Sequence, residues 1–264
     1  MADEEPLLTQ RKDGVLTVTI NRPHRKNAVD GATWDGLREA FRNAGQDPDV
    51  RVLVLTGAGG NFCAGADLSS DRVQLHPLHR MRGINEVAQL LYQLPMPTIA
   101  KVSGVAVGAG WNMALGCDLV VASTDARFSQ IFARRGLSLD FGGSWLLPKI
   151  VGLQQAKRLA MLAEIIDAAE AQRLGLVTYL VEPDELADKV ASLAEQLCAG
   201  PPIALAQTKA LLNESNGRTL IEALDAEART QSVNFATEDT AVAFQAFRDK
   251  TEASFTGNWA VRKP

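Results

Sequence analysis

The chain has 264 residues, of which 46% are hydrophobic and 22% are charged, an ordinary balance for a soluble globular protein that argues against disorder. A net charge of −4 and the lack of Lys or Arg runs argue against a nucleic-acid partner. Three cysteines without C-x-x-C spacing, an acidic N-terminus and the lack of a long apolar run predict a cytoplasmic protein without a membrane partner.

Strand and helix patterns alternate through the first half of the chain. Val15–Ile20 alternates Thr with aliphatic residues and predicts a half-buried strand, whereas Val50–Gly57 predicts a more buried one. The apolar spacing of Asp30–Gly45 predicts a helix between them, with Asp30 as its candidate N-cap. The alternation returns in a strand at Thr98–Val107, a short helix at Gly110–Cys117 and a strand at Asp118–Ser123. This order predicts an α/β fold with a largely parallel sheet.

After a strand at Leu176–Val181 the strand patterns stop. Helical patterns fill the rest of the chain, near residues 184–199, 202–213, 219–234 and 238–248. We therefore expect two parts, an α/β core over residues 1–195 and a C-terminal helical region over residues 196–264. Because no flexible linker separates them, the helices are expected to pack on the core or on a neighbouring subunit.

Two glycine-rich turns follow predicted strands, at Thr56–Leu68 and at Gly104–Gly116. In open α/β sheets such turns expose backbone amides, and ligands bind there. Neither turn has the G-x-G-x-x-G spacing and the later acidic residue of a dinucleotide site. Each turn alone is consistent with tight packing, but the two together suggest a pair of backbone N–H donors able to hold an oxyanion.

Other catalytic patterns are missing from the sequence. There is no G-x-S-x-G, which argues against a serine hydrolase. His76 and His79 are close in sequence, but Pro77 lies between them, and we interpret both as loop residues rather than metal ligands. No metal site is predicted.

A single ionisable side chain, Asp140, stands in the apolar and glycine-rich segment Gly136–Pro148. Its spacing before two glycines and an apolar run favours a helix N-cap or a turn. The alternative is a catalytic carboxyl group. Apolar surroundings disfavour the charged form of a carboxyl and raise its pKa, which suits a general base that must also return its proton.

Five segments together resemble the crotonase, or enoyl-CoA hydratase/isomerase, superfamily: Asn21–Val29, Leu53–Leu68, Pro97–Ser123, Gly136–Gly152 and Ala168–Val181. The likeness covers nearly the whole chain. It implies a spiral of ββα units with a C-terminal helical trimerisation region. It also implies an acyl-CoA thioester substrate, with coenzyme A as part of that substrate and no tightly bound cofactor, and a homo-oligomer that is a trimer or a dimer of trimers.

The resemblance assigns roles to particular residues. The backbone N–H groups of Ala66 and Ala109 would form the oxyanion hole that holds the thioester oxygen. Contacts with coenzyme A carry over to seven residues: His24, Arg25, Lys26, Ala64, Asp67, Leu68 and Lys250. Arg25 and Lys26 are equally consistent with solvated surface charges, whereas Ala66 and Ala109 act through the backbone.

Two departures from the family pattern concern the glutamates that hydratases use. Their positions fall on Asn112 and Phe132, neither of which can relay a proton, so ordinary hydration is not expected. Asp140 instead occupies a position that resembles the isomerase branch, particularly the epoxyphenylacetyl-CoA isomerases of phenylacetate breakdown. One carboxylate suffices for a double-bond shift, because the same group removes the α-proton and returns a proton at the γ-carbon.

Four residues are acyl-pocket candidates: Asn112, Phe132, Phe141 and Trp145. The aromatic rings would exclude water, or they are simply core aromatics. The rest of the pocket is expected from residues 69–95 and the C-terminal helices, and the choice between a fatty and an aryl acyl group stays open. The leading hypothesis is an acyl-CoA isomerase that shifts a double bond or rearranges an aryl epoxide, with Asp140 as both acid and base. The alternatives are a hydratase-like lyase that uses Asp140 with an ordered water, and a catalytically silent acyl-CoA-binding homologue.

Overall fold

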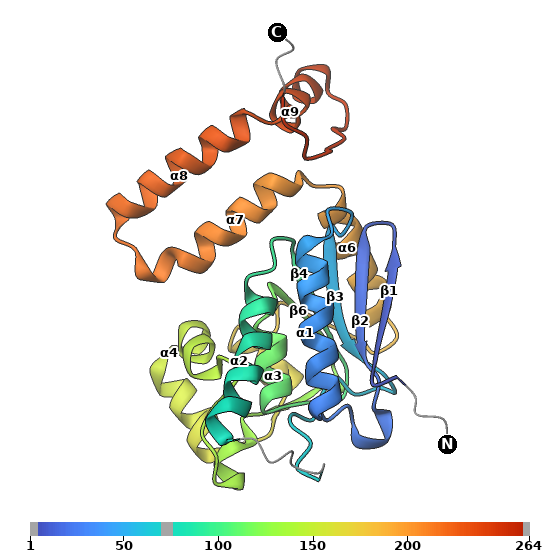
Figure 1. Cartoon of the computed structure of the whole chain (residues 1–264), viewed down its shortest axis with the longest axis vertical. Coiled ribbons are helices and arrows are strands. Elements are labelled where there is room, and N and C mark those ends of the chain that lie inside the picture. Colours follow the sequence, from blue (N-terminus) through green and yellow to red (C-terminus); the bar gives the residue numbers. More distant parts are fainter. Residues whose placement is uncertain (1–4, 70–75, 261–264) are drawn as a thin grey trace.

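The computed structural model describes residues 5–69 and 76–260 of the chain. A six-stranded sheet runs through the α/β body in the order β1-β2-β3-β4-β6-β9 (Figure 1). Its strands are β1 (Leu7–Lys12), β2 (Val15–Ile20), β3 (Val52–Gly57), β4 (Thr98–Val102), β6 (Leu119–Ser123) and β9 (Tyr179–Val181). Within this sheet β1 and β2 pair antiparallel, and every other neighbouring pair is parallel. The predicted largely parallel sheet is therefore confirmed.

A second, three-stranded sheet has the order β5-β7-β8. Its strands are β5 (Val105–Val107), β7 (Arg127–Ser129) and β8 (Ile166–Asp167). The single strand predicted over Thr98–Val107 is wrong, because the chain turns at Ser103 and Gly104 and leaves the large sheet for the small one. Gly104 takes a φ of +54° there, a left-handed conformation that glycine adopts without a steric penalty.

Helices occupy most of the remaining described chain. The α-helices are α1 (Gly31–Gln46), α2 (Pro77–Tyr92), α3 (Ala109–Leu115), α4 (Gly143–Leu162), α5 (Ala168–Arg173), α6 (Leu186–Cys198), α7 (Pro202–Glu214), α8 (Leu220–Phe235) and α9 (Glu238–Asp249). Short 3₁₀ helices are η1 (Pro23–Arg25), η2 (Ile131–Arg135) and η3 (Ser215–Gly217). The predicted N-cap of α1 is confirmed, since the Asp30 carboxylate accepts a hydrogen bond from the Thr33 N–H at 2.9 Å. None of these helices is both long and apolar enough to cross a membrane.

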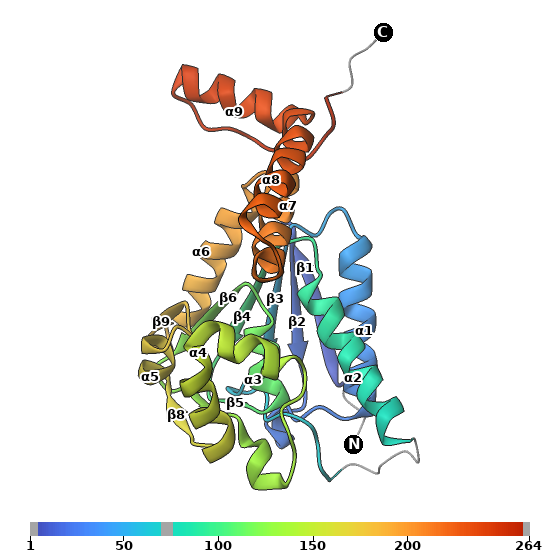
Figure 2. The same cartoon turned by 90° about the vertical axis from the view of Figure 1, so that its left-hand side faces the viewer.

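Both faces of the large sheet are covered, with α1 and α2 on one side and α6 on the other (Figure 2). Strand β3 shows how the sequence produces this arrangement. Leu53 and Leu55 belong to the core cluster that includes Phe41 of α1, whereas Val52 and Val54 belong to the cluster that includes α6. Because successive residues of a strand point to opposite faces, a strand buried on both sides needs an unbroken apolar run.

The C-terminal helices α7, α8 and α9 extend beyond the end of the α/β body (Figures 1 and 2). Helix α6 still packs on the sheet, and the predicted boundary at residue 195 falls within its last turn. Helix α7 is joined to the body by Lys209, whose Nζ lies 2.8 Å from Asp118 Oδ2 and donates to the Met96 carbonyl at 3.1 Å. The Lys209 side chain is 9% exposed, so this ion pair is largely shielded from water.

We predict that Lys209→Met lowers the free energy of unfolding by about 1–2 kcal/mol, because it leaves the Asp118 carboxylate without its cation while keeping the aliphatic stem. Urea denaturation measures the change. The matched control is Arg229→Met in α8, where both partners of the Arg229–Asp225 pair are mostly exposed, so that the expected change stays within about 0.5 kcal/mol. Equal effects of the two substitutions would show that Lys209 does not anchor α7.

Candidate active site

The two glycine-rich turns lie against each other. Cys63 pairs with the second sheet through its N–H to the Val105 carbonyl and through its carbonyl to the Val107 N–H, both at 2.9 Å. A Cβ atom at Gly65 would lie 2.8 Å from the Val107 carbonyl oxygen, and one at Gly110 would lie 2.3 Å from the Cys63 carbonyl oxygen. Glycine is therefore required at both positions, because any side chain would push the two turns apart.

This contact places the N–H groups of Ala66 and Ala109 on adjacent loops. Ala66 forms a parallel bridge with Val29, in which the Val29 N–H bonds Gly65 and the Asp67 N–H bonds the Val29 carbonyl. The N–H of Ala66 itself therefore points away from Val29. Ala109 is the first residue of α3, where an N–H has no intrahelical acceptor. Within residues 5–69 and 76–260 neither N–H donates a hydrogen bond, so both can receive an oxyanion.

Asp140 lies in the turn that precedes α4. The N-cap of α4 is Gly142, which has a φ of 79°, and no side chain caps the helix, so the interpretation of Asp140 as an N-cap is wrong. The alternative interpretation, that Asp140 forms a turn, is confirmed: its backbone carbonyl accepts a hydrogen bond from the Gly143 N–H at 2.9 Å. The carboxylate oxygen Oδ1 is buried and has no hydrogen-bond partner in the described part of the chain.

The surroundings of Asp140 change its acidity. Burial raises the pKa of the Asp140 carboxyl from its usual value of 3.8 to about 6. Within the described residues, no cation or hydrogen bond opposes this effect. A carboxyl with such a pKa is mostly ionised at neutral pH, yet it takes up a proton readily. Perturbed acidity of this kind is typical of groups that transfer protons.

The three aromatic pocket candidates have different surroundings. Phe141 is buried and stacks on Trp34 with 5.6 Å between ring centroids. Phe132 is also buried, and its ring lies 3.6 Å from the point that a Cβ of Gly108 would occupy, beside the turn that carries Ala109. Trp145 is 44% exposed, so its interpretation as a core aromatic is wrong.

Trp145 instead belongs to a partly exposed group at the start of α4. Its ring meets Tyr92 of α2 edge-on at 5.3 Å, and Lys149 Nζ lies 4.3 Å from the ring centroid. The group therefore links α4 to α2, the helix that lies within the segment predicted to line the acyl pocket.

Asn112, the fourth pocket candidate, uses both atoms of its amide within the protein. Its Nδ2 donates to the Asp140 carbonyl at 2.9 Å, and its Oδ1 accepts from Gln130 Nε2 at 2.8 Å. The sequence analysis missed Gln130. The only available signal was its place two residues before Phe132, in the segment where hydratases carry a glutamate.

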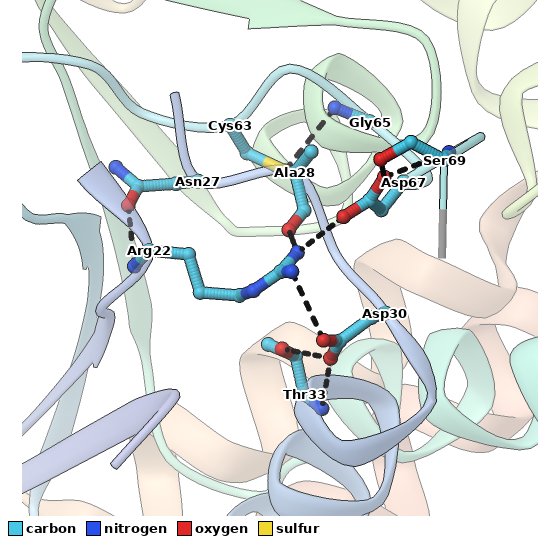
Figure 3. A network of polar contacts seen from close by, with 9 residues as sticks. All are labelled: Arg22, Asn27, Ala28, Asp30, Thr33, Cys63, Gly65, Asp67 and Ser69. Atoms are coloured by element: carbon cyan, nitrogen blue, oxygen red, sulfur yellow. Dashed lines mark hydrogen bonds and ion pairs between the residues drawn. The ribbon is translucent and has the colours of Figure 1, made fainter. Parts of the chain in front are cut away.

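A polar network centred on Arg22 holds the loop of Ala66 (Figure 3). The Arg22 guanidinium donates to Asp67 at 2.9 Å and to the Ala28 carbonyl, and it lies 3.1 Å from Asp30. Arg22 thereby joins the N-cap of α1 to the loop that presents the Ala66 N–H. The sequence analysis did not single out Arg22, because only the fold brings its two carboxylate partners together.

Asp67 is ionised in this network. Burial raises the pKa of its carboxyl, but hydrogen bonds from Ser69 and Arg22 and the Arg22 charge outweigh burial and lower the pKa to about 2. Its side chain is 6% exposed. The Asp67 carboxylate therefore accepts hydrogen bonds from Arg22 and Ser69.

The other coenzyme A candidates divide into two groups. His24, Arg25 and Lys26 are exposed at η1, and the Lys26 carbonyl accepts from the Ala64 N–H at 3.0 Å, which places η1 beside the loop of Ala66. Leu68 is exposed in the same loop. Lys250 lies at the C-cap of α9, and α9 is at the opposite end of the molecule (Figure 1). One chain therefore assembles all of these candidates except Lys250.

A cavity of about 750 Å³ opens beside the loop of Ala66, between α1 and α2. Ala66 and Leu68 line one end, and Trp34 and Ile84 provide apolar walls. Asp140 and Ala109 are not among its lining residues, but the lining residue Trp34 stacks on Phe141, which is next to Asp140 in sequence. Its α2 wall belongs to the segment 69–95 that was predicted to contribute to the acyl pocket; residues 70–75 of that segment lie outside the described chain.

The histidines near α2 need a correction. His79 lies in the first turn of α2 rather than in a loop, and His76 is the N-cap of that helix, with its Nδ1 accepting from the Leu78 N–H at 3.3 Å. No cluster of His, Cys, Asp and Glu side chains that could hold a metal ion occurs in the described ranges. All three cysteines are free thiols.

We predict that Arg22→Met lowers the free energy of unfolding at pH 7 by about 2–4 kcal/mol, because Asp30 and Asp67 lose their shared cation. The stability that ionised Asp67 contributes is complete above its unfolded pKa near 4 and is lost as the pH falls towards 2. The difference between wild type and variant should therefore shrink on acidification over this range. Denaturant unfolding at several pH values measures it.

The control for this experiment is Arg11→Met, which breaks a 2.9 Å ion pair with Asp47 whose partners are both more than a third exposed. This variant should change stability by about 0.5 kcal/mol or less. A loss in Arg22→Met that stays the same from pH 7 to pH 3 would contradict the network, because it would not depend on the carboxylates.

Known proteins of one family are similar to this chain. A family model for enoyl-CoA hydratase/isomerase matches residues 10–258. The chain is 36% identical over 259 residues to 1,2-epoxyphenylacetyl-CoA isomerase from Escherichia coli (strain K12), covering 96% of this chain and 99% of that protein. It is 35% identical over 247 residues to a short-chain-enoyl-CoA hydratase from Clostridium acetobutylicum, covering 92% and 95% of the two chains.

A solved structure shares the fold as well. The enoyl-CoA hydratase of Mycobacterium smegmatis superposes with a TM-score of 0.90 at 32% identity, covering 96% of this chain and 99% of that one. Relatives with both kinds of name, isomerase and hydratase, thus match nearly the full length. With the family model spanning almost the whole chain, this protein has the crotonase fold and belongs to the enoyl-CoA hydratase/isomerase family.

Proposed function

We propose that this protein is an acyl-CoA isomerase in which Asp140 is the only acid and base. The observation that carries the proposal is a buried carboxyl group whose Oδ1 has no hydrogen-bond partner in the described chain and whose pKa is raised to about 6. The two positions that resemble the glutamates of hydratases hold Asn112 and Phe132, which are buried and cannot ionise.

The reaction needs one proton to leave and one to return. The Asp140 carboxylate removes a proton from the carbon α to the thioester, and the electron pair moves onto the thioester oxygen. The N–H groups of Ala66 and Ala109 hold the resulting oxyanion, and the protonated carboxyl then delivers its proton to the γ-carbon. A double bond has moved, and Asp140 has returned to its starting state. Rearrangement of an aryl epoxide uses the same enolate-stabilising site and is supported by the name of the 36% identical relative from Escherichia coli.

The substrate lies across two regions in this proposal. Its coenzyme A part binds along η1 and the segment Ala64–Leu68, where exposed His24, Arg25 and Lys26 supply polar and cationic groups for the phosphates. The acyl group extends past the oxyanion loop towards α2 and the cavity beside it. Coenzyme A enters and leaves as part of the thioester, so the reaction requires no tightly bound cofactor.

The active form is proposed to be a homo-oligomer, a trimer or a dimer of trimers, formed through the C-terminal helices. Seven large apolar side chains there are more than half exposed in the single chain: Leu212, Leu220, Ile221, Leu224, Phe235, Phe244 and Phe247. Such a surface is costly in water and is typical of an interface between subunits. Lys250 could then reach the coenzyme A site of a neighbouring subunit. Three free thiols are consistent with the expected reducing, cytoplasmic location.

Hydration is the second candidate, because several relatives are named hydratases. Asp140 would then orient and deprotonate an ordered water. Crotonyl-CoA separates the two reactions, since hydration removes the conjugated thioester absorbance and an isomerase leaves it nearly unchanged. Rapid loss of that absorbance with wild-type protein would reject the isomerase assignment in favour of hydration. Calorimetric binding of acyl-CoA without turnover of saturated, 2-enoyl, 3-enoyl or aryl esters would instead indicate a silent binding protein.

We predict that Asp140→Asn lowers kcat for isomerisation of a 3-enoyl-CoA by at least about 10²-fold while binding of coenzyme A, measured by calorimetry, changes little. The variant should also be more stable than wild type above pH 7, by about 3 kcal/mol, because burial opposes the ionised carboxylate. This stabilisation should vanish below pH 4, where the carboxyl is protonated in both folded and unfolded chains. Asp184→Asn in the exposed loop before α6 is the control and should change neither property.

We predict that kcat/KM falls as the pH drops through about 6, reaching about one tenth of its plateau near pH 5, because the base must be ionised to accept the α-proton. Stopped-time assays between pH 4.5 and 8 measure the profile. His24→Gln, His76→Gln and His79→Gln serve as controls, and each should keep the acidic limb. Loss of the limb in any of these variants would assign it to that histidine instead of Asp140.

A further inference from the structure

Two buried amide side chains beside Asp140 take no part in the proton transfer described above. Asn112 comes from α3 and Gln130 precedes η2, and both are fully buried. Burying an amide costs stability unless hydrogen bonds compensate, and they do so here at every amide atom except Gln130 Oε1, which has no hydrogen-bond partner in the described chain. Their partners therefore indicate what they do.

The hydrogen bonds form a directed chain. The Asp140 carbonyl can only accept, so it fixes which end of the Asn112 amide is the nitrogen, and Gln130 Nε2 donates to the other end, Oδ1, at 2.8 Å. The nitrogen, Nδ2, donates to the Asp140 carbonyl at 2.9 Å. The Asn112 amide is thus held at both ends, by the Asp140 carbonyl and by Gln130, and it contributes one of the hydrogen bonds that hold the Asp140 backbone.

The start of α4 packs directly against this amide. A Cβ atom at Gly143 would lie 2.4 Å from Asn112 Nδ2, so the backbone of Gly143 touches the amide with no side chain between them. The Gly143 N–H also donates to the Asp140 carbonyl at 2.9 Å. The main chain of Asp140 is therefore bonded twice, whereas its Oδ1 is left without a partner in the described chain.

We propose that Asn112, held at its other end by Gln130, is a positioning residue that fixes the main chain of Asp140 so that its carboxylate remains unbonded and available to the substrate. This inference rests on the proposed function of Asp140. It also implies that the residue at position 112 helps to determine whether the enzyme catalyses isomerisation or hydration. An acidic side chain there would lose the donor to the Asp140 carbonyl and would place a second negative charge beside the catalytic one.

Asn112→Asp tests the inference, because the new side chain has the same shape and can still accept from Gln130. We expect kcat to fall about 10- to 100-fold through misplacement of the carboxylate, with KM within about threefold, since the coenzyme A contacts come from η1 and the loop of Ala66. The acidic limb of the pH profile should move up by about one pH unit, because a nearby negative charge opposes ionisation of Asp140.

Two further variants separate position from charge. Asn112→Ala should lower kcat to a similar degree without moving the acidic limb, since it removes the donor but adds no charge. Gln130→Met should lower kcat less, because Asn112 can still reach the Asp140 carbonyl. Asn43→Asp makes the same change as Asn112→Asp on the exposed side of α1 and should leave kcat and the pH profile unaltered. Thermal melting of every variant identifies any that fails to fold.

Measured beside these variants, Asp140→Asn distinguishes the two proposals. Full activity in Asp140→Asn would overturn the proposed function. Inactive Asp140→Asn together with wild-type kcat in folded Asn112→Ala and Asn112→Asp would overturn the positioning role alone. If the wild type shows no isomerase activity, NMR of the carboxyl carbons tests the contact between position 112 and Asp140 directly. The Asp140 signal is assigned as the one that disappears in Asp140→Asn. Its pKa should then rise in Asn112→Asp and not in Asn43→Asp, and an unchanged value in Asn112→Asp would overturn the inference.

Discussion

The close backbone contact between the two glycine-rich turns is the constraint on which the site depends. Cys63 hydrogen-bonds both Val105 and Val107, and the glycines at 65 and 110 leave no space for a side chain between the turns. The contact joins a loop that follows β3 of the large sheet to β5 of the small sheet. Because the donors are backbone groups, the sequence can vary around Ala66 and Ala109 only as far as their small size allows.

Helix α3 transmits this constraint to the carboxyl group of Asp140, the proposed acid and base. All seven of its residues are buried, so the helix has a fixed position in the core. Its first residue supplies the Ala109 N–H, and its fourth residue, Asn112, bonds the Asp140 carbonyl. One short, rigid element therefore sets the distance between a proposed oxyanion donor and the proposed base. Misplacement of reacting groups by a fraction of an ångström is costly in catalysis, and a buried helix limits such displacement.

Much of the framework follows from the sequence because it depends on local patterns. The apolar runs predict β2 and β3, and Asp30 predicts the start of α1, because strand burial and helix capping are encoded within a few residues. The predicted strand at 98–107 failed because the turn at Gly104 moves the chain between two sheets, and the apolar pattern is the same on both sides of that turn.

The site residues that the sequence analysis missed are those defined by distant partners. Arg22 contacts Asp67 across 45 positions of sequence, and Gln130 contacts Asn112 across 18. Neither separation carries a periodic signal, so only the packed structure reveals the pairs. For Trp145 the prediction was wrong for a different reason. Its large apolar ring predicts burial, but the edge-on contact with Tyr92 and the Lys149 ammonium allow it to remain half exposed.

The surroundings of three carboxyl groups, those of Asp30, Asp67 and Asp140, shift their pKa values in different directions. Asp30 and Asp67 share the Arg22 guanidinium and accept hydrogen bonds from Thr33 and Ser69, which outweigh burial and lower the pKa of each. Asp140 has burial alone, and its pKa is raised to about 6. Groups with lowered pKa values stay ionised throughout the neutral range and cannot exchange protons there.

Unlike Asp30 and Asp67, Asp140 therefore has a carboxyl group able to accept and return a proton near neutral pH. Pairing Asp140 with a cation would stabilise the fold and abolish this property. The hydrogen bonds of Asn112 and Gly143 avoid that outcome, because they hold the Asp140 main chain and leave the Oδ1 of its carboxyl group unbonded. Precise placement and an available carboxylate oxygen are thus achieved by bonding different atoms of the same residue.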